Sequence, residues 1–297
     1  MPKYSTAFGM DVHLRLTTVC ALDADTGEAV TRRFPGNPWG EIAGWMDGFP
    51  GPSLAAYDGA TARLATAKQR LLAFLARRGF VYGGTTPAGN PRKYWTYDFL
   101  RWLDKVRPED DGGARTLAAL RNEVEAAAEA RADLLSEYRA AVDASPIAAE
   151  VAALQSIKGC AFALAAAFSA EVGDFARFRS GRQVTAYFGL APSQRSSGDS
   201  VRLGGISGAG NALVRKLAVE GSWCYAAARH QPKLMPRDTG VPLEIRMHGR
   251  KGSERLLRRR EEMLARGMPA AKANAATAAE LVRWLWALGM MCREGAE

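Results

Sequence analysis

The stretch that decides the fold runs from Leu154 to Trp223 and contains three telling segments: AEVGDFARFRSGRQV (170–184), YFGLAPSQRSSGD (187–199) and GGISGAGN (204–211). Glycines, arginines and paired serines recur along it. Glycine lets a backbone come close to a ligand, and arginine binds phosphate oxygens through its planar guanidinium group. The stretch therefore predicts a site that grips a phosphodiester backbone.

The charge of the chain is concentrated at its carboxy-terminal end. The 297 residues carry a formal net charge of +9, and residues 177–297 alone carry 21 basic and 10 acidic side chains. Residues 1–58 carry 4 basic and 7 acidic side chains. A basic segment of this kind favours an anionic partner, most simply nucleic acid. The alternative is a solvated basic surface without a specific partner.

Other bulk features exclude several classes of protein. The four cysteines are scattered without a CxxC pair and there are only three histidines, which argues against a zinc site and a disulfide framework. No secretory signal is recognisable at the amino terminus. No uninterrupted apolar run reaches the roughly 18 residues of a membrane span. The composition therefore predicts a cytoplasmic protein that does not enter a membrane.

The amino-terminal residues follow the order of a ribonuclease-H-like α/β domain. Alternating patterns and turn residues predict strands over 4–12, 16–23 and 28–34, a helix over 38–48 and a fourth strand over 53–57. Asp11 would end the first strand and Asp58 would follow the fourth. Two carboxylates at neighbouring strand ends are suited to holding Mg²⁺ for phosphoryl transfer. The alternative is that each aspartate merely forms a turn.

The middle of the chain is predicted to be helical. A helix over 60–80 is followed by an aromatic loop over 83–97, a short helix near 96–105 and a long helix over 114–143. The long helix has heptad spacing, with Arg131 in one seam position, which indicates a coiled-coil hairpin or a dimer seam. Packing on its own domain is equally compatible with the pattern. Pro146 marks a break, so we predict domains over 1–58, 59–146 and 147–297.

The carboxy-terminal domain is predicted to be mainly helical. Residues 154–173 have the pattern of a helix-hairpin-helix element that turns at Gly159. Ser196 and Ser197 lie between arginines, and a glycine-rich turn at a helix start can hold phosphate beside a serine nucleophile. The alternative for the serines is an ordinary turn. The alternative for Arg177, Arg179 and Arg182 is a solvated helix start over two core phenylalanines, Phe175 and Phe178. The candidate DNA-binding residues are Arg177, Arg179, Arg182, Arg195, Arg202, Gly204, Gly205, Asn211, Arg215 and Lys216.

These segments resemble the carboxy-terminal domain of the DEDD-type insertion-sequence transposases, relatives of the Piv DNA invertase and now understood as bridge-RNA-guided recombinases. The resemblance covers nearly the whole chain. GMDVH (9–13) looks like the opening strand of the family, and QRLLAFLARRG (69–79) with WTYDFLRWL (95–103) looks like its helical linker. Residues 250–288 resemble its terminal basic and tryptophan-bearing helices.

The resemblance implies a RuvC-like domain with four acidic residues, joined to a domain with a catalytic serine. Asp11 then takes the first acidic place, and Asp58 stands where the family usually has glutamate. Ser197 would be the nucleophile, with Ser196 as the reserve, forming a 5′-phosphoserine link to DNA with help from carboxylate-bound Mg²⁺. The implied partners are DNA, a structured guide RNA and further copies of the chain in a dimer or tetramer.

The sequence departs from the family directly after Asp58. The chain enters the linker helix at 60–70, and the fifth strand with its closing acidic pair has no counterpart. The resemblance therefore predicts a transposase with impaired catalysis. The alternatives are a non-catalytic nucleic-acid-binding remnant and a helical interaction protein that uses the seam over 114–143.

Overall fold

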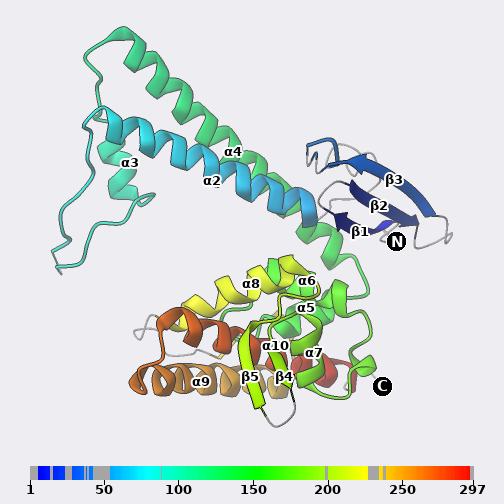
Figure 1. Cartoon of the computed structure of the whole chain (residues 1–297). Coiled ribbons are helices and arrows are strands. Elements are labelled where there is room, and N and C mark those ends of the chain that lie inside the picture. Colours follow the sequence, from blue (N-terminus) through cyan, green and yellow to red (C-terminus); the bar gives the residue numbers. More distant parts are fainter. Residues whose placement is uncertain are drawn as a thin grey trace. The chain divides into compact units, whose positions relative to one another are not determined.

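The computed structural model divides into two compact units, one ending at Ala141 and the other beginning at Val142 (Figure 1). It describes residues 6–13, 16–23, 29–36, 38, 40–42, 54–87, 89–197, 200–226, 234–236 and 239–294. The finer division predicted at residues 58 and 146 stays a prediction.

A three-stranded antiparallel sheet forms the start of the first unit. Its strands are β1 (Thr6–His13), β2 (Leu16–Asp23) and β3 (Ala29–Pro35), in the order β1-β2-β3. Val19, Phe34 and Ile42 make a small buried cluster. The first three predicted strands are confirmed within two residues. Residues 40–42 are helical, and the rest of the helix predicted over 38–48 lies almost wholly outside the described residues.

The fourth strand predicted over 53–57 is wrong. Residues 54–57 belong to helix α2 (Leu54–Arg77), which continues without a break through the helix predicted from residue 60. Alanine and leucine favour a helix, and Tyr57, Ala60, Ala67 and Leu71 are buried at helical spacing. Asp58 therefore lies within the opening turns of a helix and not after a strand.

The first unit continues as a helical hairpin made of α2, the short α3 (Tyr97–Leu103) and the long α4 (Asp111–Asp143). Two contacts show that α2 and α4 run antiparallel in one chain, because Arg70 pairs with Glu123 at 2.8 Å and Arg131 donates to Thr61 Oγ1 at 3.1 Å. Apolar side chains of α4 join the same buried cluster as those of α2: Leu117, Leu120 and Val124. From Leu117 to Arg131, the seam predicted on the long helix therefore packs against α2 of the same chain.

The second unit is a helical bundle with one β-hairpin, coloured green to red in Figure 1. Its elements are α5 (Ala148–Leu154), α6 (Phe162–Val172), η1 (Phe175–Arg177), α7 (Gly181–Tyr187), β4 (Pro192–Ser197), β5 (Ser200–Ile206), α8 (Ala212–Ser222), η2 (Trp223–Ala226), α9 (Leu243–Ala265) and α10 (Ala270–Glu294). Helix α10 is central because it packs on α5, α7, α8 and α9. The mainly helical prediction is confirmed for this unit.

Helix α5 ends at Leu154 and α6 begins at Phe162, so the helix-hairpin-helix element predicted over 154–173 stays a prediction, and the turn between the two helices packs into the protein. Gly159 has a φ of +91°, and a Cβ there would lie 2.8 Å from the Gly221 carbonyl oxygen of α8. The glycine is therefore required for a close approach between backbones. The use of this turn to bind a phosphate stays a prediction.

Candidate nucleic-acid site at the hairpin

The two serines lie in strand β4 of a tight hairpin. Arg195 pairs with Arg202, Ser196 with Val201 and Ser197 with Ser200. Successive positions of a strand belong to opposite faces. Position 197 therefore shares a face with positions 195, 200 and 202, whereas position 196 belongs to the other face. The alternative of an ordinary turn is not supported at either serine, because both are strand residues paired with β5. Positions 198 and 199 lie outside the described residues.

The glycine-rich segment after β5 is locked against the end of α7. Gly210 has a φ of +70°, and a Cβ there would overlap the Tyr187 carbonyl oxygen. Gly189, with a φ of +67°, meets the backbone of Ala209 in the same way. Glycine is needed at both positions because a side chain would push the two segments apart. The segment leading into α8 is therefore held firmly by backbone contacts.

Asn211 caps helix α8. Its Oδ1 accepts hydrogen bonds from the backbone N–H groups of Leu213 at 2.9 Å and Val214 at 3.1 Å. Its Nδ2 donates to Glu171 Oε2 at 2.8 Å. An N-cap side chain satisfies the donors that would otherwise bind an anion. Asn211 therefore has a structural role at the start of α8, and its contact with DNA stays a prediction.

Glu171 connects α6 to the loop and to α7. Besides Asn211, it accepts a hydrogen bond from the Tyr187 hydroxyl at 2.7 Å. This bond and partial burial raise the pKa of Tyr187 above its ordinary value. The Arg177 guanidinium lies 4.6 Å from the ring centroid of Phe178 and 4.8 Å from that of Tyr187. Arg177 therefore packs within an aromatic cluster, which supports the structural alternative for this residue.

The raised pKa of Tyr187 predicts a pH dependence. Because the folded chain favours the protonated phenol, this stabilisation is present at neutral pH and is lost as the pH rises through the raised pKa. We expect Glu171→Gln to lower the pKa of Tyr187, since a neutral amide no longer opposes the phenolate. The measurement is an alkaline absorbance titration, taken as the difference between each chain and its Tyr187→Phe counterpart. The same Tyr187 titration in the parent chain and in Glu171→Gln would contradict the assignment of Glu171 as a cause of the raised pKa.

The remaining predicted DNA-binding residues fall into separate groups. Arg215 donates to the carbonyl oxygens of Phe188 at 3.2 Å and Ala209 at 2.7 Å, so it ties α8 to the loop. The side chains of Arg195 and Arg202 lie outside the described part of the structure. The other members of the predicted set are exposed to solvent: Arg179, Arg182, Gly204, Gly205 and Lys216.

The carboxylates predicted to hold Mg²⁺ do not form the expected pair of strand ends. Asp11 lies inside β1, opposite Thr18, and Asp58 lies on helix α2. Within the residues that the structure describes, no group of three or more His, Cys, Asp or Glu side chains could hold a metal ion. The described residues thus do not fit the two-carboxylate arrangement at Asp58. A requirement for Mg²⁺ stays a prediction.

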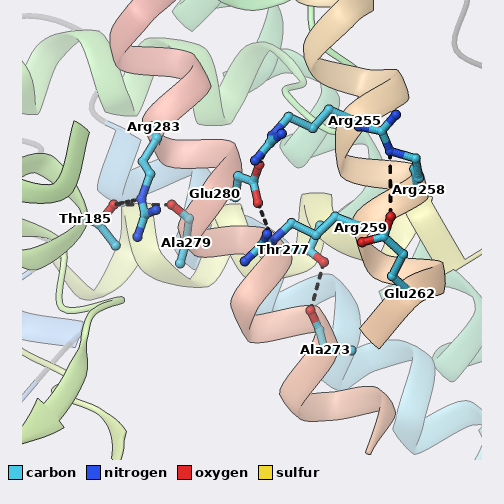
Figure 2. Close-up of polar contacts among 10 residues, drawn as sticks. All are labelled: Thr185, Arg255, Arg258, Arg259, Glu262, Ala273, Thr277, Ala279, Glu280 and Arg283. Atoms are coloured by element: carbon cyan, nitrogen blue, oxygen red, sulfur yellow. Dashed lines mark hydrogen bonds and ion pairs between the residues drawn. The ribbon is translucent and has the colours of Figure 1, made fainter. Parts of the chain in front are cut away.

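An arginine cluster between α9 and α10 was missed in the sequence. Glu280 of α10 accepts from Arg255 Nε at 2.6 Å and pairs with Arg259 Nε at 2.8 Å (Figure 2). Both arginines come from α9, four residues apart, so they lie on one helix face. That spacing was the available signal, but the sequence does not show that a single glutamate from another helix gathers them.

Comparison with known proteins shows that the hairpin lies in a segment similar to transposases. Residues 151–237 match the model of the Transposase IS116/IS110/IS902 family. A putative transposase, y4qE, from Sinorhizobium fredii is 32% identical over 245 residues, which cover 81% of this chain and 57% of that protein. The transposase for insertion sequence element IS1111A from Coxiella burnetii is 37% identical over 116 residues, or 39% of this chain and 30% of that protein.

The chain therefore spans about half the length of the first of these relatives and less of the second. None of the helices in the described part of the chain combines the length and apolar character needed to cross a bilayer. The matched residues include both strands of the hairpin, the glycine-rich segment and α8. The segment that builds this site is thus similar to the IS116/IS110/IS902 transposase family over residues 151–237.

Proposed function

We propose that the chain is a transposase that cuts and joins DNA through Ser197. The observation that carries the proposal is the register of the β4–β5 hairpin, which puts position 197 on the same face as two arginine positions. Arginine beside a serine nucleophile neutralises the charge that develops on a phosphoryl group. The hairpin lies inside the segment that matches the transposase family.

The proposed chemistry is a transesterification. The Ser197 hydroxyl oxygen attacks a DNA phosphorus, an O–P bond forms, and the bond from phosphorus to the 3′ oxygen breaks. The serine proton ends on the departing 3′ oxygen, and the DNA remains attached as a 5′-phosphoserine. Arg195 and Arg202 balance the negative charge of the phosphoryl group during the exchange. The bond energy is kept in the phosphoserine, so the reverse attack can rejoin DNA.

The proposed partners are nucleic acids and further copies of the chain. The basic excess over residues 177–297 suits DNA and a structured guide RNA, as in the Piv-like, RNA-guided relatives that the sequence resembles. Each chain supplies one such serine, whereas recombination breaks more than one strand, so a homo-oligomer is required. In this proposal residues 1–58 are a partial RuvC-like domain. Catalysis is impaired relative to relatives with a complete acidic set.

A second function is a nucleic-acid-binding protein that no longer cuts. The position of Asp58 on helix α2 favours it, because a metal site at the end of a fourth strand would need a different backbone. The third alternative, a helical interaction protein built on the seam of α4, loses its basis. That seam is covered by α2 of the same chain.

The experiment that separates these functions is a search for a covalent protein–DNA complex. Purified chain is incubated with labelled DNA carrying the ends of its element and with the RNA encoded beside it, with and without Mg²⁺, and then denatured. A labelled band that survives denaturation supports the serine transposase. Salt-sensitive binding without such a band under either condition contradicts it and supports the non-cutting alternative.

A further inference from the structure

We propose that a trough between α9, α10 and the β4–β5 hairpin holds a single strand of nucleic acid and leads it to the hairpin. The ligand class is an unpaired polynucleotide, recognised by its phosphates and by the faces of its bases. This inference names a ligand for the proposed function. It rests on that function only in taking the hairpin as the place where DNA reacts. The trough itself is defined by residues of the second unit alone.

The trough consists of two adjoining cavities. One has a volume of about 430 Å³ and includes His248 and Trp284 in its lining. The other has a volume of about 670 Å³ and reaches Gly204, Gly205 and Ile206 of β5. Both are lined by Arg259, Glu280 and Arg283, so they share one wall. A ligand can therefore extend from Trp284 on α10 to strand β5.

The wall that the two cavities share is positively charged and pre-organised. Glu280 is 11% exposed and pairs with both Arg255 and Arg259, whose side chains remain 48% and 54% exposed (Figure 2). Arg283 is oriented by a hydrogen bond from its Nε to Thr185 Oγ1 at 3.2 Å. One carboxylate thus pairs with two guanidinium groups, and the third, of Arg283, is held by a hydroxyl group. The excess positive charge, presented in fixed positions, is suited to phosphate.

The α10 side of the trough, here called its floor, is apolar and is built mainly from small side chains, whereas Leu190, Ile206 and Met268 line other parts of the same cavity. Along α10 it is lined by alanines, including Ala275, Ala276 and Ala279. At Gly205 a Cβ would meet no atom within 4 Å. At the far end, the rings of Trp284 and His248 lie with centroids 4.8 Å apart and an interplanar angle of 54°. Small apolar surfaces and an aromatic end wall suit the faces of nucleobases.

These features favour a single strand over other occupants. In a duplex the bases are stacked on one another, so they could not lie along the alanines or against Trp284. A purely apolar peptide would leave the arginine wall without a counter-charge. A single strand satisfies both surfaces at once, with phosphates on the arginines and bases on the floor.

Two pairs of substitutions test the electrostatic part. Arg259→Ala with Lys272→Ala removes two positive charges from the trough lining. Arg250→Ala with Arg258→Ala removes two positive charges from α9, in exposed ion pairs with Glu254 and Glu262 that line neither cavity. Binding to fluorescent oligo-dT, oligo-U and a duplex is measured by anisotropy over a range of salt concentrations. The strand that binds more tightly, dT or U, identifies DNA or RNA as the source.

We expect the trough pair to weaken single-strand binding about tenfold and to lower the salt slope by about two, and the control pair to change binding much less. Ala276→Trp tests the shape of the trough without a change of charge, since Ala276 is exposed and a large ring there fills the cavity. It should weaken single-strand binding and leave duplex binding unchanged. Circular dichroism confirms that each variant is folded.

Equal losses in the trough pair and the control pair would overturn the inference, as would unchanged binding in Ala276→Trp or a preference for the duplex. These outcomes are distinct from those for the proposed function. If Ser197→Ala binds single strands as the parent chain does and no covalent complex ever forms, the trough stands and the transposase chemistry fails. If the covalent complex forms but the trough variants bind single strands normally, the transposase chemistry stands and the trough inference fails.

Discussion

Replacing Ser197 with alanine is expected to abolish the covalent protein–DNA complex. The hydroxyl oxygen is the only atom that the proposed reaction joins to phosphorus, so its removal leaves no partial activity to measure. Binding to DNA should be nearly unchanged, since one uncharged hydroxyl contributes little to an interaction dominated by phosphate contacts. The measurement is the fraction of labelled DNA that stays with the protein after denaturation, compared with the fraction bound before it.

Ser196→Ala is the matched control for this result. It removes the same hydroxyl from the neighbouring position, which the hairpin register assigns to the opposite face. The covalent complex should therefore persist. A complex that survives in Ser197→Ala and disappears in Ser196→Ala would show that the reserve serine is the nucleophile. A complex that survives both substitutions would contradict a nucleophile in this strand.

The second large effect is expected from Gly210→Ala. The new Cβ would overlap the Tyr187 carbonyl oxygen at a φ of +70°, so the loop before α8 must move away from α7. Backbone strain and overpacking each cost about 1–3 kcal/mol, which predicts a loss of about 3 kcal/mol in the free energy of unfolding of the carboxy-terminal unit. Chemical denaturation followed by circular dichroism gives the value.

Gly208→Ala provides the comparison because it lies in the same segment with nearly the same backbone. Its φ is +71°, but a Cβ there would meet no atom within 4 Å among the described residues. Only the conformational cost of about 1 kcal/mol is expected. Equal destabilisation by the two substitutions would mean that the contact with Tyr187 does not hold the loop.

Much of the fold follows from local patterns in the sequence. Alternation identified the first three strands, and heptad spacing identified the long helix α4 together with its seam. The error at residues 53–57 arose because a run of small apolar residues fits a buried strand as well as a helix. Only the continuing pattern of Ala60, Ala67 and Leu71 shows that the helix starts earlier.

The candidate site could be predicted less completely from local patterns in the sequence. Arginine and asparagine in a glycine-rich segment suggest phosphate binding, but Asn211 and Arg215 are engaged with backbone groups of the protein. These partners lie in segments that only the folded chain brings together. The same reason hides the gathering of Arg255 and Arg259 by Glu280, which is contributed by a separate helix.

The most direct test of Ser197 as the nucleophile is to locate the DNA attachment on the protein. The covalent complex is isolated, digested with nuclease and protease, and the peptide that spans the β4–β5 hairpin is sequenced by mass spectrometry. We expect a phosphoryl group with its residual nucleotide on Ser197. Attachment at a tyrosine, or at a serine outside the hairpin, would contradict it.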